Sequence, residues 1–204
     1  MSGERLSIFP LHGVILFPGL QLPLHVFEPR YRELVGHALA KDRRIAMIQP
    51  QSAREGAPLF AMGCVGRIED VEALEDGRYN IVLEGEARFR LLRELDVTTP
   101  YRQVEGELIP DADDEVLSSA ERASFEREAR RFANAQGYSV DWESVERLDD
   151  ELLVNGVSQI APFDAAAKQA LLEASDLRTR CELLVQLMQF FGKSDPDESR
   201  VTLQ

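Results

Sequence analysis

Residues 8–31 read IFPLHGVILFPGLQLPLHVFEPRY, and this stretch decides the fold of the chain around it. Four prolines and two glycines divide it into apolar runs that are too short and too interrupted for a helix. Because proline removes a backbone donor, these runs are predicted to be edge or bulged strands. Glu28-Pro29-Arg30-Tyr31 then predicts the start of a helix, since proline is favoured at the first helical position.

The rest of the first half repeats short strand patterns bounded by glycine or proline. Beyond Pro29, apolar residues spaced by three and four positions predict one buried helix face, and Asp76-Gly77 predicts a tight hairpin. The apolar alternation restarts across residues 84–86, which predicts a bulge. Strands are predicted at 6–8, 14–17, 22–27, 44–50, 59–75, 79–92 and 101–109. About six to eight strands with glycine corners favour a small barrel.

The second half of the chain has the patterns of helices. Ser118 and Glu121 form a capping-box signature, and Asp176 is a good cap for the last helix. That helix carries an apolar heptad stripe at Leu177, Cys181, Leu184, Met188 and Phe191. The predicted domains are a barrel over residues 1–110, a helical bundle over 116–192 and a disordered tail over 193–204, with an acidic linker at 110–115.

The ordered string FPL…LFPG…LPLHVFEPRY resembles the start of the Lon protease amino-terminal (substrate-binding) domain in its stand-alone form, and residues 162–180 resemble that family near its end. The resemblance covers about residues 5–192. It implies an α+β fold, with an amino-terminal PUA-like β pseudobarrel carrying one or two helices and a carboxy-terminal helical bundle. It also implies a protein that binds polypeptide.

A complete Lon protease also needs a phosphate-binding loop and a Ser-Lys proteolytic dyad. Gly192-Lys193-Ser194 does not fit that loop, because Leu187 stands where its first glycine belongs and the triplet ends a helix instead of starting one. We therefore expect this chain of 204 residues to lack both catalytic parts. The prediction is a non-enzymatic module without catalytic residues, cofactor or metal.

The candidate binding residues come from the same motif. A turn that places Phe17 and Leu20 beside proline and glycine is expected to expose apolar surface, which marks binding sites, although packing is an equal alternative. The predicted peptide contacts are Phe17, Pro18, Leu20, Leu22, Phe27 and Tyr31. The predicted polar contacts are Glu28, Arg30, Arg78, Arg88 and Arg90, although Glu28 and Tyr31 could instead serve the start of the helix.

The sequence allows other kinds of site. Arg78, Arg88 and Arg90 could form an RNA-binding face, but cross-strand pairing with Glu69, Asp70, Glu84 and Glu86 is the simpler role. Cys64 could be a nucleophile with His25 as its base, although a buried small side chain is favoured. The spacing of His12, His25 and His37 does not resemble a metal-binding motif.

Charge and composition limit the partners. The net charge is −13, and residues 101–204 contribute most of it, with 22 acidic against 11 basic side chains. Such a chain repels phosphate backbones, so nucleic acid is not an expected partner. No run is long enough for a membrane span and no signal peptide is visible. Two distant cysteines favour the cytoplasm. The expected partners are unfolded or apolar polypeptide segments, with an ATP-dependent protease as a candidate; the oligomeric state is left open.

Overall fold

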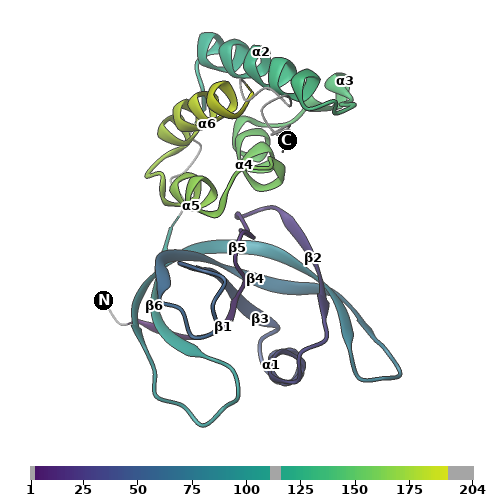
Figure 1. The fold of residues 1–204 in the computed structure, drawn as a ribbon, viewed down its shortest axis with the longest axis vertical. Coiled ribbons are helices and arrows are strands. Elements are labelled where there is room, and N and C mark those ends of the chain that lie inside the picture. Colours follow the sequence, from purple (N-terminus) through teal and green to yellow (C-terminus); the bar gives the residue numbers. More distant parts are fainter. Residues whose placement is uncertain (1–2, 111–115, 193–204) are drawn as a thin grey trace, which may run out of the picture. The chain divides into compact units, whose positions relative to one another are not determined.

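The computed structural model describes residues 3–110 and 116–192 (Figure 1). The predicted linker at 111–115 and the predicted tail at 193–204 lie outside these residues. The chain divides into two compact units, and the first contains residues 3–110 together with 155–173. The second contains residues 116–154 and 174–192. The sequence predicted a division by chain order, whereas the packing groups residues 155–173 with the strands.

The first unit is built on one sheet of mixed direction. Its strands are β1 (Glu4–Pro10), β2 (Gln21–Val26), β3 (Arg44–Pro50), β4 (Leu59–Ala73), β5 (Tyr79–Glu94) and β6 (Gln103–Ile109). The strand order is β2-β5-β4-β3-β1-β6, and β6 also pairs with β5. Five strands therefore close into a ring, and β2 is left at the edge with β5 as its one partner among the described strands. Only β1 and β3 run parallel; the other pairs are antiparallel.

The predicted corner-turning glycines are confirmed. Between β4 and β5 the register shifts at Val65/Gly66, opposite the predicted 84–86 corner, and again at Ile68/Asp70. The Asp76-Gly77 hairpin is present, and Gly77 has the positive φ of 81° that this turn requires. The bulges increase the local twist and let two long strands curl around the core.

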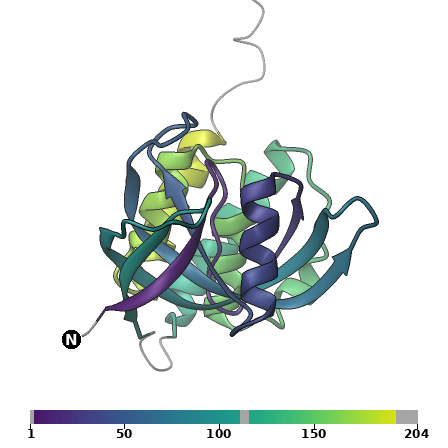
Figure 2. The same ribbon diagram turned by 90° about the horizontal axis from the view of Figure 1, so that it is seen from below.

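Two apolar clusters fill this unit. One lies inside the closed ring and is centred on Phe89, with Leu6, Ile8, Val65 and Val104 around it. The other lies between the sheet and α1 (Pro29–Leu39), which Figure 2 shows lying across the strands. Tyr31, Leu34, Val35 and Ala38 are the buried residues of that helix, as their spacing predicted. Leu34 and Val35 are fully buried, and each contributes about 1.5–3 kcal/mol.

The predicted strand at 14–17 is not formed. Residues 14–17 have no ladder partner, and one isolated bridge joins Pro18 to Gly85. The backbone N–H of Phe17 instead donates to the side chain of Gln159, at 3.1 Å. Ile15, Leu16 and Phe17 are buried as expected and Val14 is half-buried, but a side chain 142 positions later replaces the sheet ladder.

Buried amides attach residues 155–173 to the strands. The Gln49 amide donates to Gln169 Oε1 and to the carbonyl of Ala165, both at 3.1 Å. Gln169 in turn donates to the carbonyl of Met62, at 3.1 Å, and Arg88 donates to the carbonyl of Leu172, also at 3.1 Å. Because buried polar groups need partners, this network specifies how α5 (Ala165–Glu173) lies on the sheet.

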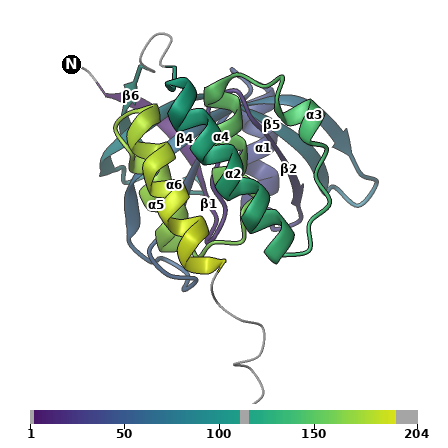
Figure 3. The same cartoon turned by 90° about the horizontal axis from the view of Figure 1, so that it is seen from above.

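The second unit is helical. Its elements are α2 (Ser119–Ala135), α3 (Trp142–Val145), the first part of α4 (Asp150–Ile160) and α6 (Leu177–Phe191). Figure 3 shows α2 and α6 side by side. The capping box of Ser118 and Glu121 is present, and Arg122 joins α2 to Asp150 through an ion pair of 2.6 Å. The heptad stripe is confirmed at Leu177, Cys181, Leu184 and Met188, which are buried, whereas its last member, Phe191, is half-buried.

Candidate functional site

The 17–20 turn is held tightly by backbone groups. Gly85 donates to the carbonyl of Leu20 and accepts from the N–H of Gly19, both at 2.9 Å. Gln159 closes the same turn, because its amide also donates to the carbonyl of Gln21 at 2.9 Å. Phe17 is fully buried, so this part of the motif packs. Pro18 and Leu20 are half-buried and remain candidates for binding.

The backbone of β2 presents alternate residues to the open edge. The carbonyl of Leu20 points toward β5, where it meets Gly85, and the carbonyl of Gln21 points the other way, toward Gln159. Successive residues of a strand alternate in this respect, so Leu22 and Leu24 bond to β5 whereas Pro23 and His25 face away from it. Pro23 has no N–H to offer there, which is the position in which an edge strand tolerates proline.

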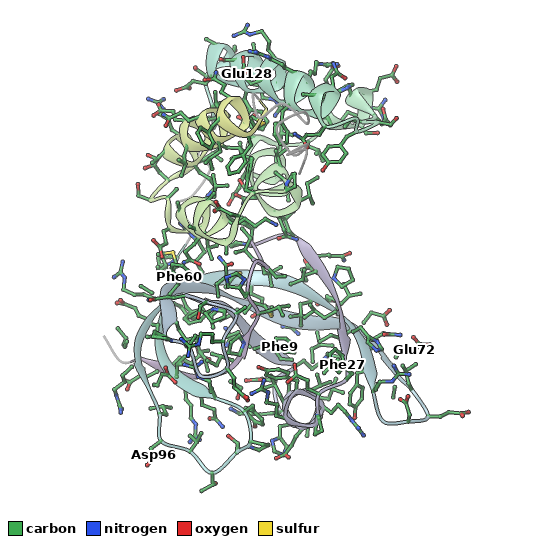
Figure 4. The ribbon with its side chains drawn as sticks, viewed as in Figure 1. Phe9, Phe27, Phe60, Glu72, Asp96 and Glu128 are labelled. Carbon is green, nitrogen blue, oxygen red and sulfur yellow. The ribbon has the colours of Figure 1, made fainter. Side chains whose placement is uncertain are left out.

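The side chains of β2 alternate in the same way between two faces. Leu22 and Leu24 are half-buried against the cluster under α1. Gln21, Pro23, His25 and Phe27 are exposed on the opposite face. Phe27 is 60% exposed, the most of any phenylalanine in the first unit (Figure 4). Because this large ring lies exposed at the end of an open strand, Phe27 is a candidate contact for a ligand of that edge.

Polar side chains fix the surroundings of Phe27. Its ring stacks on His25 with 6.2 Å between centroids. Arg78 donates to Nε2 of His25 at 3.2 Å, so Nδ1 carries the proton and donates to Asn80 Oδ1 at 2.7 Å. The Asn80 amide then donates to Glu72, at 2.6 Å. This chain of hydrogen bonds holds the imidazole beside the exposed ring.

The beginning of α1 is mainly structural. Arg30 pairs with Glu28 at 2.9 Å and with Glu55 at 2.7 Å, which ties the 51–58 loop to the helix. The guanidinium also lies 4.7 Å from the ring centre of Tyr31, which stacks on Phe9 at 4.1 Å. Burial raises the pKa of Tyr31, so its hydroxyl stays protonated. Tyr31 is buried, which leaves Glu28 and Arg30 as the accessible groups of this segment.

The three arginines do not form one patch. Arg78 pairs with Asp76 at the hairpin, at 2.6 Å, and Arg90 pairs with Glu107, at 3.5 Å. About 40 Å of extended chain separates these two positions. Arg88 is 6% exposed and binds the carbonyl of Leu172. Glu86, one of the acids expected to pair with these arginines, binds Arg44 and Arg67, at 2.9 and 3.0 Å.

The geometry does not support the nucleophile hypothesis. Cys64 is fully buried and donates to the neighbouring carbonyl of Val65, whereas His25 lies on the exposed face of β2. Burial raises the pKa of Cys181 to about 11, so the thiol of Cys181 stays protonated. Among residues 3–110 and 116–192, no group of three His, Cys, Asp or Glu side chains is placed to hold a metal ion.

The comparisons with known proteins identify the family. A model described as the ATP-dependent protease La (LON) substrate-binding domain matches residues 5–189. This chain belongs to the Lon substrate-binding domain family. The resemblance and the fold class predicted from the sequence are thereby confirmed. The solved Lon N-terminal domain protein from Xanthomonas campestris superposes with a TM-score of 0.67 at 26% identity, over 90% of this chain and 98% of that chain.

Other relatives agree with the assignment to the Lon family. Lon protease 2 of Myxococcus xanthus is 28% identical over 194 residues, which are 91% of this chain and 23% of that protein. Lon protease of Escherichia coli K12 is 26% identical over 197 residues, or 91% of this chain and 25% of that protein. The chain spans about a quarter of the length of these curated relatives. The matches fall on the substrate-binding domain and not on ATPase or protease domains, so they do not indicate catalysis.

Pro23 and His25 lie on the same exposed face of β2 as Phe27 in this member of the Lon family. Of the three, the residues predicted from the sequence to bind peptide included Phe27 alone. The alternation of residues 21–27 was the available signal, because it places Pro23, His25 and Phe27 on one face.

In the described ranges, no helix has both the length and the apolar character needed to cross a membrane.

Proposed function

We propose that this chain is a recognition module that binds extended polypeptide segments at β2 and Phe27. The observation that carries the proposal is the open edge of β2 in a sheet whose other strands close on themselves, with an exposed phenylalanine at its end. The family description, a substrate-binding domain, supports the same class of ligand. The sequence-derived candidates Pro18, Leu20 and Leu22 adjoin this edge, whereas Phe17 and Tyr31 support it from within.

An open strand edge fits a ligand that varies in sequence. Backbone hydrogen bonds to an added strand do not depend on side chains, and alternate side chains supply the selectivity. Unfolded proteins and degron-bearing termini offer extended backbone of this kind, whereas folded proteins mostly do not. The proposed substrates are therefore unfolded or degron-bearing polypeptides. A short edge and one exposed ring favour weak and reversible binding, because few side chains are fully desolvated.

The partner that would use such binding is a separate ATP-dependent protease. The relatives named above are Lon proteases, and this chain covers about a quarter of their length. As an adaptor, it would deliver a bound segment to such an enzyme. The cytoplasm remains the proposed compartment, with Cys64 and Cys181 both present as free thiols.

Fluorescence anisotropy with labelled peptides tests the proposal. We would titrate wild type, Phe27→Ala and Phe190→Ala against one probe, a ten-residue peptide in which valine and phenylalanine alternate with threonine and lysine. Phe190 on α6 is 70% exposed and serves as the matched control. We expect Phe27→Ala to weaken binding about tenfold and Phe190→Ala to leave it unchanged. Equal affinities for all three proteins would refute the proposed surface.

A parallel titration with a labelled single-stranded RNA distinguishes peptide binding from the alternative, RNA binding. Phosphate binding by arginines weakens steeply as salt rises from about 50 to 200 mM. We expect no RNA binding under conditions in which the peptide binds, because Arg78 and Arg90 are paired with acids and lie far apart. Salt-dependent RNA binding that exceeds peptide binding would reverse the assignment.

A further inference from the structure

We propose that a bound segment joins β2 as an added strand through three backbone hydrogen bonds, and that Pro23 removes a fourth. This inference rests on the proposed function and goes beyond it, because it names the bonding groups, the substrate pattern and the role of a single residue. The groups involved are the N–H and C=O of His25 and the C=O of Pro23.

The bonding groups follow from the alternation along β2. Residues 22, 24 and 26 lie opposite Leu83, Ile81 and Tyr79 of β5 and bond to that strand. The groups of residues 21, 23 and 25 point to the open edge, where Gln159 already occupies the carbonyl of Gln21. No backbone partner from the described chain meets the outward groups of Pro23 and His25. A strand added in either direction could use these three groups.

The side chains of β2 set the pattern of the substrate. Alternate residues of an added strand would lie beside the half-buried Leu22 and Leu24, which already pack on the apolar cluster under α1. The residues between them would lie on the solvent side, beside Pro23, His25 and Phe27. The substrate class is therefore an extended segment with aliphatic residues at alternate positions, and with an aromatic or polar residue tolerated at the others.

Pro23 limits how strongly the edge can bind. Open strand edges pair with one another and aggregate, and proline at an outward position is one of the ways in which proteins prevent this. Here the proline faces away from β5, so it takes a donor from the open edge without weakening the ladder inside the sheet. The residue would keep the edge available for transient capture and unsuited to permanent pairing.

An N-methyl scan of the ten-residue probe tests the bonding pattern. Methylation of one backbone nitrogen at a time removes one donor, and only alternate nitrogens of an added strand face β2. We expect losses of about fivefold at two positions separated by one unaffected position. Uniform losses, or none, would overturn the added strand. Peptide binding that still depends on Phe27 would then leave the proposed function in place, whereas no binding at all would refute both.

The substitution Pro23→Val tests the role of the proline from the protein side. Valine restores an outward N–H, so we expect the probe to bind about fivefold more tightly. Pro100→Val, at an exposed proline outside β2, is the matched control and should leave the affinity unchanged. Thermal unfolding of each variant checks that both remain folded. Unchanged or weaker binding by a folded Pro23→Val protein would contradict the inference.

Discussion

The imidazole of His25 stacks on the ring of Phe27 with an interplanar angle of 28°, on the exposed face of the one strand that has a single described partner. Two residues of the same motif thus form a surface, whereas Phe17 and Tyr31 form the core beneath it. The same stretch of sequence therefore builds the barrel on one side of β2 and offers an apolar surface on the other. Its two roles are separable by mutation.

The close approach of Gly85 to the 17–20 turn predicts a large effect of a small substitution. A Cβ on Gly85 would lie 2.7 Å from the carbonyl carbon of Phe17 and nearer still to its oxygen. We expect Gly85→Ala to lower the free energy of unfolding by about 2 kcal/mol, because backbone atoms must move. Urea denaturation followed by circular dichroism measures the change.

Gly36 supplies the control for this substitution. It lies inside α1, and a Cβ there would meet no atom within 4 Å. Gly36→Ala is therefore expected to stabilise the protein by about 0.5–1 kcal/mol, since alanine favours a helix over glycine. Equal effects of the two substitutions would show that the turn does not approach Gly85 as described.

The buried amide of Gln169 predicts that α5 depends on polar contacts. Gln169 is 2% exposed, accepts from Gln49 and donates to the carbonyl of Met62. We expect Gln169→Ala to cost about 2–3 kcal/mol, because both partners lose a buried bond. The exposed Gln186→Ala is the control in the same urea titration. A loss no greater than that of the control would mean that water replaces the missing amide.

Asp176 predicts a dependence of stability on pH. Hydrogen bonds from Ser175 and from Thr179 lower the pKa of this carboxyl to about 2, below its ordinary value of 3.8. Its stabilising contribution is therefore complete above pH 3.8 and is lost as the pH falls toward 2. Asp176→Asn keeps a cap that does not titrate, so we expect its urea midpoint to fall less over this range than that of wild type. Parallel curves would contradict the assignment.

The two thiols are predicted to be inert in the folded protein. Cys64 is fully buried and Cys181 is 4% exposed. Because the thiolate is the reactive form, protonated and buried thiols react slowly. A colorimetric thiol reagent should detect neither cysteine before unfolding and both after it. Rapid reaction of Cys64 in the native protein would contradict this prediction and would support Cys64 as a nucleophile.

Local signals in the sequence predicted much of this fold. Ser118 and Asp176 identified helix starts because a cap needs only residues three positions away. The glycine corners and the Asp76-Gly77 hairpin were likewise local. The predicted strand at 14–17 was wrong because the backbone N–H of Phe17 bonds to the side chain of Gln159. No local pattern in the sequence encodes the approach of that side chain. The grouping of residues 155–173 with the strands was missed for the same reason, since it depends on Gln49 and Gln169.

The candidate site was predictable in outline only. The motif directed attention to residues 17–31, but an apolar residue gives the same signal whether it packs or binds. The structure separates Phe27, which is exposed, from Phe17, which is buried. The sequence indicated that the arginines pair with acids but not with which ones, because their contacts, Asp76, Glu107 and the carbonyl of Leu172, come from three different parts of the chain.

Mapping of amide chemical shifts on the isotope-labelled protein, during titration with the ten-residue probe, tests the central claim most directly. We predict that the largest and saturable changes fall on residues 21–27 and on their β5 partners, residues 79–84. The Phe27→Ala protein should lose these changes while its remaining spectrum stays that of a folded protein. Changes confined to the groove lined by Leu117, Cys181 and Val185 between α2 and α6, or no changes at near-millimolar probe, would contradict the account.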